Sequence, residues 1–359
     1  MLFPIVRNVE RVQRERSMTQ TYSIGVDLGG TNLRIAAVDE QGVLIEKITL
    51  ETKVSRGRDY AISIMCDAIR QMTARYEKSA PLLGIGIGVP GIIDMQTGVV
   101  RDAENLSGWK DYPAAADIGG RLGTAVIVEN DANVAALGEQ WLGAAKDYSD
   151  MAMLTLGTGV GGGLVLGGAI WRGANGMAGE FGCATVEPEG IACGCGNRGC
   201  LEQYASGPAV VRMAREAIAS NGESPLARAA QSDPEFSAKS IYILAIKGDE
   251  DARRIFRYLG RCLGIVLSTL VSSLNLPIYV IGGGVASAWE LFSPSIFEEL
   301  RSRSMVYAAT APPDPSSGKY GASALMEAGA GPKTIITRAL LGSDAGLYGA
   351  ARLPMITKK

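Results

Sequence analysis

The sequence predicts an α/β protein made of two related domains. Short β-rich apolar runs alternate with helix-like segments along the chain, and this alternation is typical of α/β folds. A strand, a glycine turn and a second strand occur over residues 22–39 and again over residues 151–170, which indicates an internal repeat. The length of 359 residues is enough for about two domains at roughly 150 residues each.

The first half is expected to open with a hairpin and to continue as alternating strands and helices. β-rich runs bounded by turn residues predict strands over residues 22–27, 34–39, 43–50, 82–89 and 124–128. Apolar residues at helical spacing predict a helix over residues 58–76, and another that starts directly after the run Glu129-Asn130-Asp131.

The second half repeats the opening pattern and then becomes mostly helical. Strands are expected over residues 151–156 and 164–170, around a glycine turn at 157–163. The remaining expected elements are helices near 208–220, 238–247 and 249–275, a strand at 277–281, and a closing helix near 343–352.

The chain contains no histidine. This excludes Ser-His-Asp and Cys-His catalysis, histidine metal sites and an imidazole proton shuttle. A general base must therefore be Asp, Glu, Lys, Tyr or Cys. The chain has 35 Lys and Arg against 37 Asp and Glu, a net charge of −2, so its charge gives no reason to expect a nucleic-acid or anionic-membrane partner.

The start of the chain does not look like a signal peptide, because its apolar run already ends at Arg7. Two uncharged stretches, residues 151–171 and 262–289, contain several glycines and fit the core of a soluble domain better than a membrane span. We therefore expect a cytoplasmic protein with reduced thiols. Residues 1–20 are expected to form a flexible extension.

A first glycine turn follows the strand that ends at Asp27. Its backbone amides can hold phosphate oxygens, and the Asp27 carboxylate can hold Mg²⁺ through water. An ordinary hairpin turn gives the same sequence pattern. The turn residues that this hypothesis assigns to cofactor binding are Gly29, Gly30, Thr31 and Asn32.

A second glycine turn, with Gly157, Thr158 and Gly159, contains a formal G-x-G-x-x-G. A dinucleotide site needs a helix after this motif, and strand-like residues follow it instead. We interpret it as a turn that contacts phosphate. A third site, Gly282-Gly283-Gly284, follows a strand and suits packing against a nucleotide. The chain contains no G-x-x-x-x-G-K-[ST] motif.

Asn130 and Asp131 lie where a strand changes into a helix. Both residue types are favoured as helix N-caps. Alternatively, Asp131 takes a proton from a substrate hydroxyl while Asn130 orients that hydroxyl. The two roles are compatible only if Asp131 is not itself occupied as the cap.

Four of the six cysteines fall within 18 residues in the form C-x₉-C-x-C-x₄-C. In a chain with reduced thiols, Cys183, Cys193, Cys195 and Cys200 predict a structural zinc site with four thiolates. A zinc loop would also hold Glu180 and Glu202 rigidly, which suits binding of several sugar hydroxyls. The alternative for both glutamates is an exposed position on the surface.

Five motifs together resemble the ROK family of sugar kinases and related repressors. They occur in the family's order and spacing from about Tyr22 to Gly349. The motifs are D-L-G-G-T-N-L-R, E-N-D-A-N, L-G-T-G-V-G-G-G, G-E-F-G-C and C-G-C-G-N-R-G-C-L-E.

The resemblance implies an actin/hexokinase-like (ribonuclease H-like) fold, which is a duplicated α/β fold with a cleft between two domains. We expect residues 21–139 with about 337–359 to form the N-terminal domain, and residues 140–336 to form the C-terminal domain with the zinc loop at 183–200. The resemblance also implies a homodimer or homotetramer.

The resemblance further implies a hexose, ATP and Mg²⁺ as ligands. Asp131 would be the base. The residues that would bind the sugar are Gly91, Asn130, Asp131, Glu180 and Glu202, with Asn105 as a further neighbour. The first two glycine turns would contact the phosphates, and Gly282–Gly284 would contact the adenosine.

The sequence departs from the family at Cys183, where the family usually has a histidine that ligates zinc. A thiolate can replace an imidazole as a zinc ligand. It cannot replace the hydrogen bond of the second ring nitrogen. We therefore expect the substitution to affect sugar affinity or anomer preference, and not the fold.

These observations predict an ATP-dependent kinase that phosphorylates the 6-hydroxyl of a hexose, with glucose as the expected substrate. N-acetylmannosamine, N-acetylglucosamine and fructose remain alternative substrates. A sugar-responsive repressor is the non-enzyme alternative. It would need a helix-turn-helix segment before the first glycine turn, where about 20 residues precede Tyr22.

Overall fold

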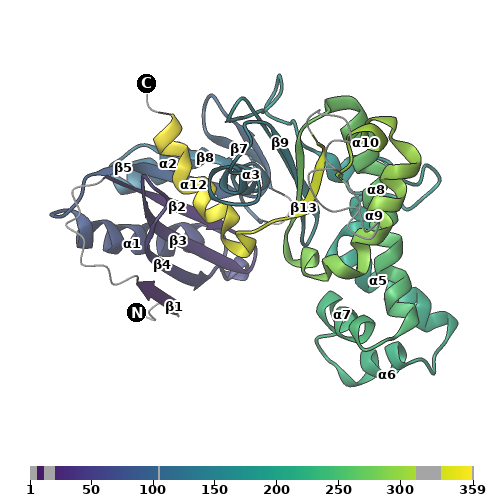
Figure 1. Cartoon of the computed structure of the whole chain (residues 1–359). Helices are drawn as coiled ribbons and strands as arrows, with labels where there is room; N and C mark the ends of the chain where they lie inside the picture. Colours follow the sequence, from purple (N-terminus) through teal and green to yellow (C-terminus); the bar gives the residue numbers. More distant parts are fainter. Residues whose placement is uncertain (1–5, 12–20, 104–105, 313–332, 358–359) are drawn as a thin grey trace. The chain divides into compact units, whose positions relative to one another are not determined.

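The structure is a computed structural model that describes residues 6–11, 21–103, 106–312 and 333–357 (Figure 1). Asn105 lies outside these residues. The chain divides into two compact units. The first consists of Met1–Ser149, Gly163–Gly179 and Ser343–Lys359, and the second of Asp150–Gly162 and Glu180–Gly342. Residues 140–149 and 163–179, which we expected in the C-terminal domain, thus belong to the first unit.

A six-stranded sheet in the order β1-β4-β3-β2-β5-β8 forms the centre of the first unit. Its strands are β1 (Val6–Arg11), β2 (Tyr22–Leu28), β3 (Asn32–Asp39), β4 (Leu44–Glu51), β5 (Leu82–Val89) and β8 (Val126–Asn130). Strands β2, β5 and β8 are parallel, and their register pairs Asp27 with Gly88 and Gly88 with Glu129. The carboxyl ends of these three strands therefore meet at one edge of the sheet.

Strand β1 corrects the expectation of a flexible extension over residues 1–20. Residues 6–11 pair antiparallel with β4, and Val9 lies opposite Ile48. Without β1, β4 would be an edge strand with a row of unpaired N–H and C=O groups. Residues 1–5 and 12–20 lie outside the described residues.

Four α-helices and a small hairpin also belong to the first unit. The helices are α1 (Arg58–Tyr76), α2 (Ala114–Leu122), α3 (Asp131–Leu142) and α12 (Ala345–Ile356), and the hairpin joins β6 (Ile92–Asp94) to β7 (Val99–Asp102). Helix α1 has the predicted bounds. It buries the predicted stripe of Ile62, Met65, Cys66, Ile69 and Met72.

Helix α12 packs on the sheet at backbone distance. A Cβ atom added at Gly25 of β2 would lie 2.2 Å from the carbonyl oxygen of Leu347, and one added at Gly86 of β5 would lie 2.0 Å from that of Ala350. Any side chain at these positions would push the helix off the sheet, because protein interiors are close-packed.

The same helix also packs against α3, and Figure 1 shows α12 in yellow beside it. A Cβ at Gly349 of α12 would lie 1.6 Å from the carbonyl oxygen of Val134, and one at Gly138 of α3 would lie 2.1 Å from that of Ala345. The two helices therefore contact each other through glycine backbone. Helix α12 holds the sheet and α3 together.

A second sheet has the order β11-β10-β9-β12-β13, and its strands β9, β12 and β13 belong to the second unit. Its strands are β9 (Met151–Leu156), β10 (Val160–Leu166), β11 (Ala169–Ile170), β12 (Ile278–Gly282) and β13 (Ile335–Arg338). Strand β12 is parallel to both β9 and β13, and Gly282 pairs with Thr155. The ends of β9 and β12 therefore lie side by side.

The expected single strand over residues 164–170 is wrong in its limits. Strand β10 already begins at Val160, because only Gly157–Gly159 form the turn. It ends before Gly167 and Gly168, whose φ angles of 58° and 77° turn the chain into β11. Positive φ angles of this kind favour glycine.

Helices make up most of the rest of the second unit. They are α4 (Glu202–Ala205), α5 (Gly207–Ser220), α6 (Pro225–Ser232), α7 (Ala238–Ile246), α8 (Glu250–Leu274), α9 (Trp289–Arg303) and α10 (Met305–Thr310). Helix α8 is long and apolar enough to cross a membrane, but 61% of its most apolar window is buried within the structure. We interpret it as a core helix of this unit.

We predict that Gly349→Ala destabilises the protein, because the new methyl group would overlap the backbone of α3. Overpacking of this kind typically costs about 1–3 kcal/mol in the free energy of unfolding. Gly120→Ala in α2 is the matched control, since no atom lies within 4 Å of its added Cβ. It should instead stabilise the helix by about 0.5–1 kcal/mol. Urea unfolding followed by circular dichroism measures both, and equal stability of the two variants would contradict the packing described for α12.

Candidate active site

Three loops of the first unit meet at the carboxyl edge of its sheet. They are the turn after Asp27, the turn that contains Gly91, and the start of α3. The Nδ2 atom of Asn130 donates a hydrogen bond to the carbonyl oxygen of Gly91 at 3.0 Å. Gly346 of α12 lies beside Asp27, since a Cβ there would be 3.3 Å from the Asp27 Cγ. The edge thus gathers Asp27, Gly91, Asn130 and Asp131.

Asn130, and not Asp131, is the N-cap of α3. Its Oδ1 atom accepts hydrogen bonds from the backbone N–H groups of Ala132 at 2.9 Å and Asn133 at 3.1 Å. Asp131 is the first residue of the helix, and its Oδ1 accepts from the Ala132 N–H at 2.9 Å. The sequence left open which of the two residues caps the helix. The structure assigns the cap to Asn130 and places the carboxylate next to it, at the positive end of the helix dipole.

The first glycine turn is closed by a hydrogen bond from the Gly29 N–H to the Asn32 carbonyl at 2.9 Å. Thr52, directly after β4, supports it, since its Oγ1 donates to the Gly29 carbonyl at 2.7 Å and its N–H to the Thr31 carbonyl at 3.1 Å. Gly30 is exposed, and no atom lies within 4 Å of the place of a Cβ. The tip of the turn is therefore open to a ligand.

Asp27 forms an ion pair with Arg34, with 2.9 Å between its Oδ2 and the arginine Nη1. Burial raises the pKa of the Asp27 carboxyl, and Arg34 works in the opposite direction. The nearby carboxylate of Asp344 raises this pKa further, and Asp344 itself is paired with Lys47 at 2.9 Å. The net effect is a pKa of the Asp27 carboxyl above its ordinary value, because burial outweighs the arginine. A cation that approached it would further favour the ionised form.

The second glycine turn lies against the third glycine site in the second unit. The Gly157 N–H donates to the Gly159 carbonyl at 2.9 Å, and the Gly207 N–H donates to the Gly157 carbonyl at 2.8 Å. Gly283 has a φ of 86°, and a Cβ there would lie 2.4 Å from the carbonyl oxygen of Leu156. Only glycine fits such a close approach.

A cavity of about 960 Å³ opens beside these turns, and Gly157, Thr158 and Gly284 line it. This volume lies within the range of roughly 300–1,000 Å³ that is typical of small-molecule sites. The sequence missed its other walls, which come from the start of α5 and from the region of α7. These walls include Pro208, Val211, Phe236 and Tyr242. The one sequence pattern that could have indicated the α5 wall is Ser206-Gly207-Pro208. A serine cap followed by proline marks the start of a helix.

Glu202 lies directly against the second glycine turn. Its Oε2 accepts a hydrogen bond from the Val160 N–H at 2.9 Å, and a Cβ at Gly159 would lie 2.4 Å from the same oxygen. The segment of Glu180 packs on the same residue, since a Cβ at Gly182 would lie 2.1 Å from the Val160 carbonyl. The structure therefore brings the segments of both glutamates to the start of β10. Glu202 is not the exposed surface acid of the alternative interpretation.

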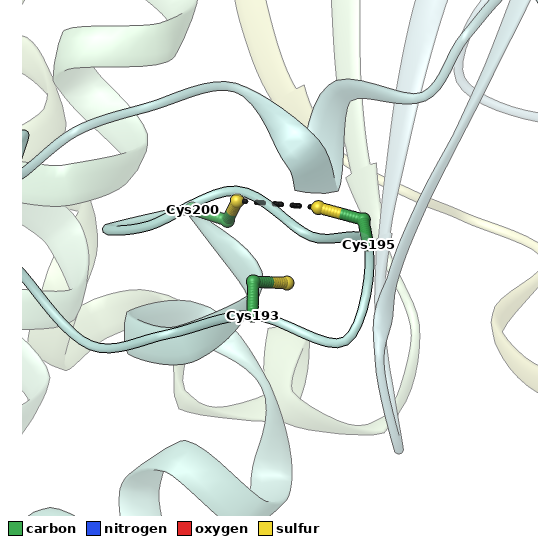
Figure 2. A group of neighbouring side chains, drawn as sticks. All are labelled: Cys193, Cys195 and Cys200. Carbon is green, nitrogen blue, oxygen red and sulfur yellow. Dashed lines mark hydrogen bonds between the residues drawn. The ribbon is translucent and has the colours of Figure 1, made fainter.

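Three of the four clustered cysteines come together (Figure 2). The sulfur atoms of Cys193, Cys195 and Cys200 all lie within 4.8 Å of one another, and those of Cys195 and Cys200 are 3.6 Å apart. Cys183 is not a member of this compact group, although it faces Cys195. Burial and that neighbour raise the pKa of the Cys183 thiol to about 12, whereas the Asn197 backbone N–H lowers the pKa of Cys195.

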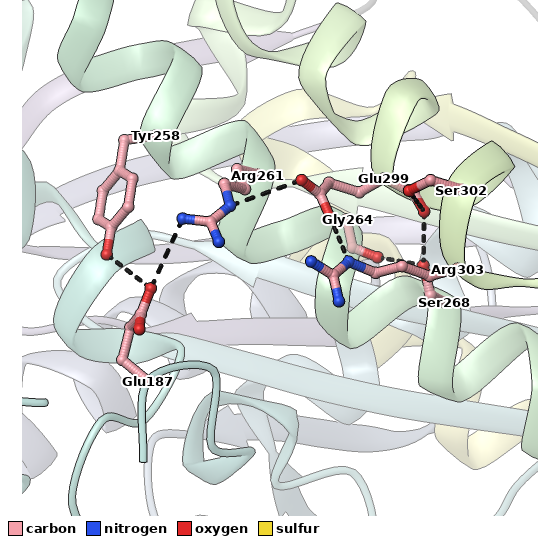
Figure 3. Close-up of polar contacts among 8 residues, drawn as sticks. All are labelled: Glu187, Tyr258, Arg261, Gly264, Ser268, Glu299, Ser302 and Arg303. Atoms are coloured by element: carbon pink, nitrogen blue, oxygen red, sulfur yellow. Dashed lines mark hydrogen bonds and ion pairs between the residues drawn. The ribbon is translucent and has the colours of Figure 1, made fainter. Parts of the chain in front are cut away.

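The cysteine loop is anchored to α8 through Glu187 (Figure 3). Tyr258 donates a hydrogen bond to the Glu187 carboxylate at 2.9 Å, and Arg261 lies 3.7 Å from it. The Glu187 backbone also explains why residue 199 is a glycine. Gly199 has a φ of 65°, and a Cβ added there would lie 1.6 Å from the Glu187 carbonyl oxygen. These contacts hold the loop against α8.

We predict that Asn130→Ala lowers the free energy of unfolding by about 0.5–2 kcal/mol, which is the usual effect of removing an N-cap. Asn130→Asp is the matched variant. It retains an acceptor for the Ala132 and Asn133 N–H groups but cannot donate to Gly91. It should recover most of the stability. Urea unfolding tests this, and an unchanged stability of Asn130→Ala would show that the cap contributes nothing.

Comparison with known proteins gives the chain its family. The sequence model of the ROK family matches residues 23–355. A glucokinase of Halalkalibacterium halodurans is 39% identical over 76% of this chain and 82% of the relative. A glucokinase of Thermotoga maritima is 34% identical over 92% of this chain and 96% of the relative. The crystal structure of a ROK glucokinase from Streptomyces griseus in complex with glucose and AMPPNP is similar with a TM-score of 0.73 and 34% identity, and covers 92% of this chain and 98% of that one. The chain therefore belongs to the ROK family.

Proposed function

We propose that this protein transfers the γ-phosphoryl group of ATP to the 6-hydroxyl of glucose and forms glucose 6-phosphate. The observation that carries the proposal is the start of α3, where Asn130 caps the helix and the Asp131 carboxylate lies beside it. The relatives described above are named glucokinases, which supports glucose as the substrate.

In this mechanism Asp131 accepts the proton of the 6-hydroxyl while that oxygen attacks the γ-phosphorus. The bond from the γ-phosphorus to the bridging oxygen breaks, and ADP leaves. A positioned general base is typically worth about 10²–10⁴-fold in rate. The Nδ2 atom of Asn130 donates a hydrogen bond to the carbonyl oxygen of Gly91, and this bond gives the turn at Gly91 a defined position.

The cavity beside Gly157, Thr158 and Gly284 fits a nucleotide. Its volume of about 960 Å³ and the apolar walls from Val211 and Tyr242 suit the adenosine part of ATP. The glycine turns would then supply backbone N–H groups to the phosphates. Mg²⁺, which neutralises phosphate charge in such reactions, would be held through water by Asp27, the partly exposed carboxylate near the end of β2.

Cys193, Cys195 and Cys200 fit a structural zinc ion, with Cys183 as the fourth ligand. Zinc–sulfur bonds of about 2.3 Å in a tetrahedron place the sulfur atoms roughly 3.8 Å apart. The distance of 3.6 Å between Cys195 and Cys200 agrees with this spacing. Such an ion would hold the loop that ends at Glu202.

We predict that Asp131→Asn lowers kcat by about 10²–10⁴-fold, because the amide cannot accept the proton. The Kd for glucose should stay near the wild-type value, since the amide retains hydrogen-bonding capacity. A coupled ADP-release assay and calorimetric titration with glucose measure the two quantities. Asp59→Asn is the control, because this side chain is 72% exposed on α1. A turnover of Asp131→Asn close to that of Asp59→Asn would refute the role of Asp131.

The same assay with glucose, mannose, fructose and the N-acetylhexosamines decides the substrate. The proposal expects glucose to have the highest kcat/KM. A higher value for N-acetylmannosamine, N-acetylglucosamine or fructose would replace glucose with that sugar and leave the kinase mechanism in place.

We predict about one zinc ion per chain in protein purified from zinc-containing medium. Cys200→Ser should lose it, because one of the three grouped thiols is removed. Cys66→Ala is the control, since Cys66 is buried in α1 and is not part of the group. Elemental analysis by mass spectrometry measures the ion. Wild-type protein with far less than one zinc per chain, or Cys200→Ser with a full complement, would contradict the site.

A further inference from the structure

A buried carboxylate directly precedes the residues proposed to carry the reaction. Glu129, near the end of β8, has a relative exposure of 1%. Its Oε1 accepts hydrogen bonds from the Asn130 backbone N–H and from Nδ2 of Asn133, both at 3.0 Å. Its Oε2 accepts from Nε of Arg172 at 2.7 Å. One carboxylate thus binds the residue before Asp131, the first turn of α3, and a distant arginine.

Arg172 is the only cation within ion-pair distance of Glu129 in the part of the chain that the structure describes. It follows β11, and its carbonyl accepts a hydrogen bond from the Ala178 N–H at 3.2 Å, which closes a turn. Gly176 in this turn packs on β6, since a Cβ there would lie 3.1 Å from the Ile93 carbonyl. The arginine is therefore held by the backbone around it and can hold the glutamate.

Because Glu129 is buried, its carboxylate depends on the groups around it for all of its hydrogen bonds. An ionised carboxylate that is removed from water needs a counter-charge and hydrogen bonds to all its oxygen atoms. The donors can meet this need only if the Asn130 peptide and the Asn133 side chain keep their positions. Since Asp131 lies between them in the chain, the position of its carboxylate depends on the same contacts. Misplacement of a catalytic group by about 1 Å can reduce the rate about 10²-fold.

We propose that Glu129 and Arg172 form a positioning pair for Asp131. This inference rests on the proposed function, because it assumes that Asp131 is the base. Neither residue contacts the reacting atoms in this proposal. The pair acts through the Asn130 peptide and Asn133, and its loss should therefore affect kcat more than sugar affinity.

The chain offers a matched pair elsewhere in the same unit. Glu46 on β4 is fully buried and accepts hydrogen bonds from Arg75 at 2.7 and 3.1 Å and from the Tyr76 hydroxyl at 2.9 Å. Arg75 is 36% exposed and Arg172 34%. Strands β3, β2 and β5 separate β4 from β8 in the sheet. The Glu46–Arg75 pair therefore has the same chemistry on a strand that is not a neighbour of β8.

The test compares Glu129→Gln, Arg172→Met, Arg172→Lys and the double variant with Glu46→Gln and Arg75→Met. We expect Glu129→Gln and Arg172→Met to lower kcat about 10- to 100-fold, with the Kd for glucose within about three-fold of wild type. Arg172→Lys should recover part of the rate. The double variant should lose less than the product of the single losses, since contacting residues couple. The Glu46 and Arg75 variants should lower Tm and leave the kcat of folded protein unchanged.

Hydrogen–deuterium exchange of the peptide over residues 126–137 gives a readout that is independent of the reaction. It should be faster in Arg172→Met than in wild type, and unchanged in Arg75→Met. Unchanged kcat and exchange in folded Glu129→Gln and Arg172→Met would overturn the positioning pair. Wild-type protein that phosphorylates no hexose would overturn the proposed function instead, and the exchange data would still decide whether the pair holds the start of α3.

Discussion

The contact of α12 with the first sheet and with α3 is the constraint on which the first unit depends. Glycine backbone forms this contact on both sides, at Gly25 and Gly86 in the sheet and at Gly138 and Gly349 between the helices. Because α3 begins with Asp131, the position of the proposed base is set by how closely these backbones approach. Gly346, in the first turn of α12, also reaches Asp27. The chain has 46 glycines among its 359 residues, and those described here serve either close packing or the open turns.

Charge at the carboxyl edge is arranged in pairs. Asp27 faces Arg34, Asp344 faces Lys47 and Glu129 faces Arg172. Arginine and lysine keep their charge through the neutral pH range, and the chain has no histidine to switch within it.

Much of the local structure could be predicted from the sequence, because it depends on short-range patterns. The bounds of α1, β5 and β9 agree with prediction, since each has a clear periodicity or a clear turn at its ends. The glycine turns and the cysteine cluster were visible as motifs. Strand β1 and the two-residue strand β11 were missed, since pairing partners and not local propensity define them.

The parts of the site that were missed depend on contacts between distant segments. Glu129 and Arg172 are 43 residues apart, and nothing in the spacing of either residue indicates the other. The walls of the cavity from α5 and α7 are similar cases. The sequence also could not show that Cys183 faces the compact cysteine group without joining it, because this depends on how the loop folds back over β10.

The discontinuous composition of the first unit has a consequence for how the chain folds during synthesis. Its sheet and α3 are made early, but the helix that covers Gly25 and Gly86 comes from residues 345–356. The second unit, which ends at Gly342, is therefore synthesised before the first unit is complete. Until α12 emerges, the faces of β2 and β5 that it covers are without their partner. Contacts between such distant parts of a chain are slow to form, so docking of α12 should be the last step of folding.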